Sequence, residues 1–150
     1  MTRALFDLTF WPAVPFWALM ILAPRWRRTP TIVASPLICA PPLLIYATLV
    51  LPEFGPFLAA LANPNLPGLQ TILAGSTGAA AAWAHFVGFD LFLGRWIYFD
   101  SRERGIHPVP ISVLLLFTIL FAPLGVLGYL IIRFLPAYRP IPNQPTYAET

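Results

Sequence analysis

The chain has 150 residues, enough for one domain, and 58% of them are hydrophobic while only 10% are charged. A soluble domain carries about 25% charged residues to cover its surface, so this composition excludes the ordinary soluble classes and favours a surface that faces lipid. The net charge of +3 is too small to indicate a nucleic-acid-binding protein. No lysine is present, which excludes a pigment held by a lysine Schiff base.

Four apolar stretches are long enough to cross a bilayer as helices, which takes about 20 residues. In chain order they cover residues 4–23, 32–51, 76–99 and 109–135. Prolines break the region between the second and third stretches into pieces too short to cross, which predicts a short interfacial helical segment there. Residues 136–150 are rich in proline and are expected to form a flexible tail. The predicted fold is one all-α polytopic membrane domain with four transmembrane helices.

Arginines in the predicted loops indicate how the four spans are oriented. The first and third connections carry five arginines and the opposite side carries three: Arg25, Arg27, Arg28, Arg102 and Arg104 against Arg3, Arg133 and Arg139. Basic residues favour the cytoplasmic side, so we expect both termini to lie on the other side. The first span follows only three residues and lacks a cleavage site, which favours a retained span. We expect a multi-pass protein of a bacterial inner membrane, or the mature form of a protein targeted elsewhere.

His85 and Asp90 lie near the middle of the third span. A charged side chain at that depth costs about 2.5–3.5 kcal/mol on insertion scales, so such residues are functional candidates by default. Successive helical residues turn by about 100°, which places Asp90 about 140° from His85 and Arg95 a further 140° round. We therefore take His85, Asp90 and Arg95 as the candidate catalytic residues. The alternative is a structural role for each residue. His85 would form an interhelical hydrogen bond, Asp90 would be the partner of an intramembrane arginine or a kinked backbone, and Arg95 would snorkel.

Phe89, Phe92, Trp96 and Phe99 recur along the same helix every three or four residues, on the side of His85. The candidate substrate-binding residues are Trp83, Phe89, Phe92 and Trp96. Such a stripe suits a long, flat, apolar ligand with His85 as its polar contact. Helix packing with an aromatic belt at the interface is the alternative explanation. Asp100 and Arg104, four residues apart, predict a salt bridge at the end of the helix.

No cofactor is expected from the sequence. The two histidines, His85 and His107, are 22 positions apart and match no usual metal-ligand spacing, so we predict no metal site. No phosphate-binding loop or nucleophile elbow is present. The expected partner is membrane lipid, and the sequence leaves open whether the chain forms a homo-oligomer.

The run from Trp83 to Phe86, continued by Asp90 to Tyr98 and by Asp100, resembles the abscisic-acid-deficient-four-like family of neoxanthin-synthase-like membrane proteins. The similarity covers residues 10–135 and includes Pro15-Phe16-Trp17, Ser35-Pro36-Leu37-Ile38, Pro123-Leu124-Gly125 and Gly128-Tyr129-Leu130. The resemblance implies a membrane protein that makes neoxanthin from violaxanthin, which is an intramolecular isomerisation without a redox cofactor. The other hypotheses are a non-catalytic membrane scaffold that binds pigment or lipid and, less favoured, a proton-linked transporter.

Overall fold

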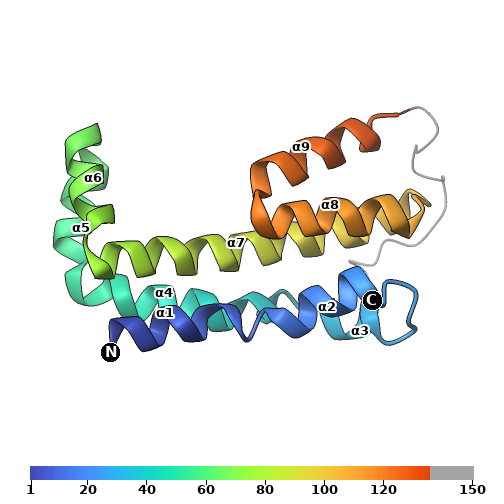
Figure 1. Ribbon diagram of the computed structural model, residues 1–150, viewed down its shortest axis with the longest axis horizontal. Helices are drawn as coiled ribbons and strands as arrows, with labels where there is room; N and C mark the ends of the chain where they lie inside the picture. The colour runs from blue at the N-terminus through green and yellow to red at the C-terminus, as the bar shows by residue number, and fades with distance from the viewer. Residues whose placement is uncertain (136–150) are drawn as a thin grey trace. The chain divides into compact units, whose positions relative to one another are not determined.

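The computed structural model describes residues 1–135, and every regular element in that range is a helix (Figure 1). The all-α prediction is therefore confirmed. The predicted flexible tail, residues 136–150, lies outside the described residues. The chain divides into two compact units. The first comprises Met1–Val14 and Leu37–Phe89, and the second comprises Pro15–Pro36 and the described residues from Asp90 onward.

The first unit contains α1 (Thr2–Phe10), α4 (Ala40–Val50), α5 (Phe54–Ala62), α6 (Leu66–Ala74) and the start of α7 (Ser76–Glu103). Small side chains on α7 allow close packing against α4, and the buried cluster that results comprises Ile45, Leu49, Val50, Ala80, Ala81 and Ala84. A Cβ atom at Gly88 would lie 2.7 Å from Leu43 Cδ2, so glycine is what permits this approach. Apolar contact, with little polar linkage, is what joins these helices.

The segment between the second and third predicted spans divides into two parts. A short 3₁₀ turn, η2 (Leu51–Glu53), joins α4 to α5, so that α5 lengthens the second apolar run. Helix α6 is capped by Asn65, whose Oδ1 accepts a 2.8 Å hydrogen bond from the Gly68 amide. It meets α7 at an angle of 95° across Gly75. The short helical segment predicted between these spans is therefore present as α6.

The second unit contains α2 (Val14–Leu22), α3 (Thr29–Val33), the end of α7, α8 (Pro108–Leu120) and α9 (Ala122–Arg133). Helix α7 ends where Gly105 takes a φ of +65°, a left-handed conformation that a residue with a side chain rarely adopts. The Ile106 amide donates to Ser101 O at 2.9 Å and the Gly105 amide to Arg102 O at 3.0 Å, which satisfies two terminal carbonyls. This tight ending turns the chain directly into α8.

Helices α8 and α9 form a hairpin (Figure 1). The chain breaks at Phe121, with φ −146° and ψ 71°, just before Pro123 starts the next helix. A Cβ atom at Gly125 would lie 2.7 Å from Thr118 N, and one at Gly128 would lie 2.7 Å from Leu114 Cδ2. Residues later in α9 thus face residues earlier in α8, which is the register of two antiparallel helices.

The prediction of four transmembrane helices needs correction. Two helical runs are long and apolar enough to cross a bilayer, Thr2–Leu22 and Pro36–Ala62, and a third is counted when α6 and α7 are taken as one bent span. The fourth predicted span, residues 109–135, is instead the hairpin. Its helix α8 has 13 residues, about 20 Å, which is less than the hydrocarbon core of about 30 Å. Pro123, near the start of α9, accompanies this reversal of the chain.

Candidate functional site on helix α7

His85 belongs to the first unit and lies among aromatic rings. Its imidazole stacks on Phe89 with ring centroids 4.5 Å apart and planes 19° apart, and it meets Tyr46 of α4 edge-on at 5.8 Å. The side chain is exposed, and no atom within residues 1–135 forms a hydrogen bond with it. A structural interhelical hydrogen bond is therefore not its role within the described residues, and both ring nitrogens remain available to a ligand.

Asp90 is half-buried in the second unit and is the ionisable residue that most needs an explanation. Within the described part of the chain, no arginine pairs with its carboxyl group and no donor forms a hydrogen bond with it. An unpaired polar group in an apolar environment is costly, so a protein that retains one usually has a use for it. A partner from outside residues 1–135, such as a ligand, fits this environment.

Arg95 contacts backbone rather than either of the other two candidates. Its Nε donates to Val33 O at 2.9 Å, its Nη2 donates to Ala34 O, and its guanidinium lies 5.1 Å from the centroid of the Phe99 ring. These carbonyls are left without helical partners because α3 ends there and Pro36 has no amide hydrogen. Arg95 therefore closes the end of α3, a function that Pro36 could have signalled in the sequence.

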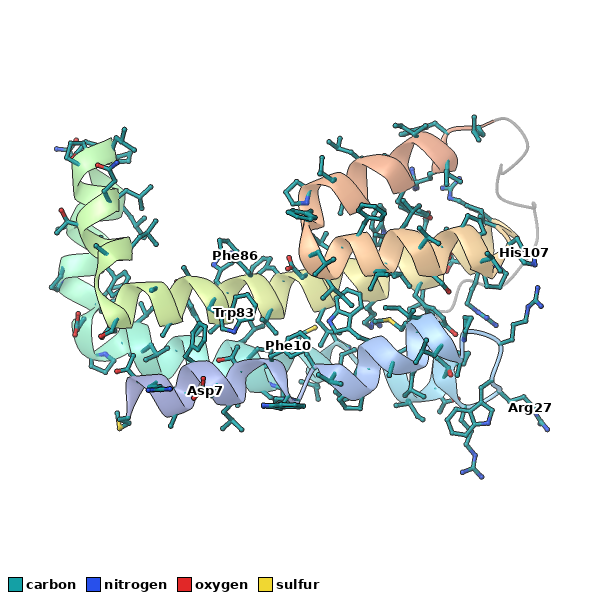
Figure 2. The ribbon with its side chains drawn as sticks, viewed as in Figure 1. Asp7, Phe10, Arg27, Trp83, Phe86 and His107 are labelled. Atoms are coloured by element: carbon teal, nitrogen blue, oxygen red, sulfur yellow. The ribbon has the colours of Figure 1, made fainter. Side chains whose placement is uncertain are left out.

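The four predicted substrate-binding aromatics have three different environments. Trp83 points toward α1, where it contacts Phe6 at 5.6 Å and Phe10 at 6.5 Å, whereas Phe86 points away from α1 (Figure 2). Trp96 lies edge-on to Tyr129 at 5.3 Å, within the second unit. The remaining two keep about half of their surface exposed, 52% for Phe89 and 49% for Phe92. Phe89 and Phe92 are thus the most open to a ligand, and Trp83 keeps 36% of its surface exposed.

A polar cluster around Asp100 joins α7 to α9 within the second unit. The predicted salt bridge to Arg104 is present, with Nε 2.8 Å from Oδ2. The same carboxylate also accepts from Arg133 Nε at 2.9 Å and from the hydroxyl of Tyr129. The sequence analysis missed these two donors. The signal was their spacing of four residues, which places both on one face of α9.

The charged groups of α7 thus fall into two sets. Asp100 is fully engaged by donors and Arg95 by carbonyls, whereas His85 and Asp90 have no hydrogen-bond partner within residues 1–135. In the same range, no group of three or more His, Cys, Asp or Glu side chains is arranged to hold a metal ion. The residues suited to act on a ligand are therefore a hydrogen-bonding imidazole and a carboxyl group on one helix.

The apolar helices are long enough to indicate a helical membrane protein. Helix α7 carries ionisable side chains that have no partner among residues 1–135, and these form the candidate site. The model of the ABA DEFICIENT 4-like family matches residues 4–129, so the chain belongs to that family. It is also similar to the protein ABA DEFICIENT 4, chloroplastic, of Arabidopsis thaliana, with 27% identity over 129 residues. That match covers 80% of this chain but only 56% of the plant protein. No solved structure matches the chain.

Proposed function

We propose that this protein acts on a carotenoid, and specifically that it isomerises a xanthophyll epoxide in a carotenoid-containing membrane, such as one of the thylakoid type. Membership of the ABA DEFICIENT 4-like family supports the class of ligand. The observation that carries the proposal is Asp90, a carboxyl group on an apolar helix with no partner among residues 1–135. An unpaired acid at such a position is what an acid-catalysed opening of an epoxide requires.

The reaction needs two proton transfers and no change in oxidation state. A C–O bond of the epoxide breaks and its oxygen takes up a proton to become a tertiary hydroxyl group, while a vinylic C–H bond gives up a proton as the allene forms. We assign protonated Asp90 as the proton donor to the oxygen, and His85, whose ring nitrogens are unbonded within the described residues, as the proton acceptor. Atoms balance because the product is an isomer of the substrate.

Spacing along α7 is compatible with one long substrate. His85 and Asp90 are five positions apart on the helix, a rise of about 7.5 Å. They point in directions about 140° apart, so a polyene end group would have to reach around the helix, or two groups of the substrate would contact them separately. Phe89, which stacks on His85, supplies an apolar surface beside the proposed base. Arg95 has no part in this assignment, since it is bound to backbone carbonyls.

The test is expression in a host that accumulates violaxanthin, followed by chromatography of the pigments. The active chain should convert the epoxide to its allenic isomer, and Asp90→Asn and His85→Ala should each lower the rate by about 10²–10⁴-fold. Asp7→Asn is the matched control, because Asp7 is an exposed carboxylate on α1 and should tolerate the same substitution. Unchanged pigments with a correctly inserted chain would exclude the isomerase.

A scaffold that binds a pigment without reaction is the alternative, and the exposed aromatic face of α7 favours it as much as it favours an enzyme. It predicts a carotenoid that co-purifies with the chain and is released unchanged. It also predicts that Asp90→Asn alters the amount of bound pigment or the melting temperature while no product forms in any variant. Pigment analysis of the purified protein therefore separates the two.

A further inference from the structure

The loop after α2 is attached to the end of α7 within the second unit. The carbonyl oxygen of Pro24 accepts from Tyr98 Oη and from Arg102 Nη1, both at 3.0 Å. One residue further on, Arg25 Nη2 donates to His107 Nε2 at 2.7 Å. These contacts hold residues 23–28 in place beside the helix end rather than leaving them as a free linker.

The arginines near this helix end differ in whether a partner neutralises them. Arg104 and Arg133 share the carboxylate of Asp100. Arg27 and Arg28 are exposed, and their guanidinium groups form no hydrogen bond or ion pair with any residue in the described range 1–135. Figure 2 shows Arg27 pointing away from the ribbon. The loop therefore presents two adjacent guanidinium groups whose charge is not compensated.

Apolar groups flank these two charges. Trp26, immediately before them, keeps 48% of its surface exposed, and Leu22, the last residue of α2, keeps 81%. A tryptophan next to basic residues at the end of an apolar helix is typical of the level of the lipid headgroups. The loop thus presents an apolar surface beside a cationic one. This combination suits an amphipathic anionic ligand.

We propose that Trp26, Arg27 and Arg28 form a binding site for the headgroup of an anionic phospholipid. Guanidinium groups suit a phosphate because their planar set of donors matches its oxygens in pairs. Basic clusters directly beside a membrane span attract anionic lipid for the same reason. Leu22 and Trp26 would lie along the acyl and glycerol parts of the lipid, and a free phosphate ion could not use them. The site is separate from the proposed function of α7 and does not depend on it.

The experiment measures the dissociation constant of the full chain, in a neutral detergent, for short-chain phosphatidylglycerol. Short-chain phosphatidylcholine serves as the neutral lipid and inorganic phosphate as the free anion. The wild type should bind phosphatidylglycerol more tightly than either. Replacing Arg27 and Arg28 by glutamine together should raise the dissociation constant by about 25-fold, about fivefold for each charge. Arg3→Gln, which removes an exposed arginine near the N-terminus, should leave it unchanged.

Helical content by circular dichroism checks that the double variant is folded, and it should match the wild type because neither arginine contacts another described residue through its charge. An unchanged dissociation constant in the folded double variant would overturn the proposal. So would inorganic phosphate binding as tightly as the lipid, because the apolar neighbours would then contribute nothing. Equal binding of the two phospholipids by the wild type would also overturn it.

Discussion

The two units of the molecule are stabilised by different kinds of contact. In the first unit, the hydrogen bonds made by Thr9, Thr48 and Thr71 each reach a carbonyl no more than four residues away, within the local helix. In the second unit, side chains link segments far apart in the sequence, as when Arg95 reaches Val33 and Ser112 reaches Ile21 O. The first unit therefore depends on close apolar packing, and the second on specific polar contacts.

The difference indicates which residues of α7 are free to serve a candidate site without loss of structural contacts. The first unit is stabilised by the packing of Ala80, Ala81 and Ala84 against α4. The imidazole of His85 forms no hydrogen bond with the described residues, so it is not needed to hold this unit together. In the second unit Arg95, Asp100 and Arg102 of α7 form hydrogen bonds with other segments, whereas the carboxyl groups of Asp90 and Glu103 have no partner among the described residues. The predictions below test this contrast between a unit stabilised by apolar packing and a unit stabilised by long-range polar contacts.

Labelling of introduced cysteines should show whether the hairpin returns the chain to the side of the membrane from which it starts. In a Cys39→Ser background, cysteines placed at Arg27 and Phe134 should react with an impermeant reagent from the same side of the membrane. The reason is that the hairpin returns Arg133 to the end of α7 that holds Asp100. A cysteine at Asn63, between α5 and α6, should react from the opposite side. Labelling of positions 134 and 63 from one side would restore the four-span topology.

Asp100→Ala should cause the largest loss of stability in the second unit. It removes the shared acceptor of Arg104, Arg133 and Tyr129, and breaking a largely buried ion pair in this way costs about 3–5 kcal/mol. Unfolding in a graded mixture of mild and denaturing detergent measures the change. Glu103→Ala is the control, since Glu103 is a nearby acid without a hydrogen bond in the described part of the chain. Equal effects of the two substitutions would contradict the role given to Asp100.

Gly125→Ala should destabilise the hairpin by about 1–3 kcal/mol in the same assay. The added Cβ would lie 2.7 Å from Thr118 N and 2.8 Å from its Cα, and backbone atoms cannot move aside cheaply. Gly55→Ala in α5 is the matched substitution in the first unit, where the new Cβ meets nothing within 4 Å. It should be neutral or slightly stabilising, because alanine favours a helix by about 1 kcal/mol over glycine. A hairpin that tolerates the alanine at position 125 would not be packed as described.

Phe89→Ala should have the smallest effect, about 0.5–1.5 kcal/mol or less, because only one exposed ring pair is lost. The more sensitive readout is the proton chemical shift of the His85 imidazole, which lies over the Phe89 ring and should move when that ring is removed. Phe92→Ala is the control, being exposed to a similar extent without a ring contact among residues 1–135. Equal shifts in both variants would mean that the stack does not persist in solution.

The sequence predicted those features of the fold that depend on residues close together in the chain. The third predicted segment, residues 76–99, falls within one long helix, α7, and Gly105 and Pro108 follow the helix end and act through their own backbone geometry. The Asp100–Arg104 pair was found for the same reason, since a spacing of four residues is enough to bring the two side chains together.

Features that depend on distant partners were not predictable in this way. The stretch 109–135 is apolar throughout, so its hydropathy did not distinguish a crossing helix from a hairpin, and the glycines that contact α8 were visible only as small residues. Trp83 and Trp96 are tryptophans of the same helix, yet their partners, Phe6 and Tyr129, come from opposite ends of the described chain. Periodicity places residues on a helix face, but what covers that face is decided by the tertiary fold.

The closed hairpin of α8 and α9 also bears on how the chain is made. A crossing helix at the end of a membrane protein obliges the cell to move everything after it through the bilayer, charged groups included. A hairpin with Arg133 held beside Asp100 enters and leaves on one side, so its arginine never has to be translocated. Insertion of α8 and α9 would then require no translocation of Arg133.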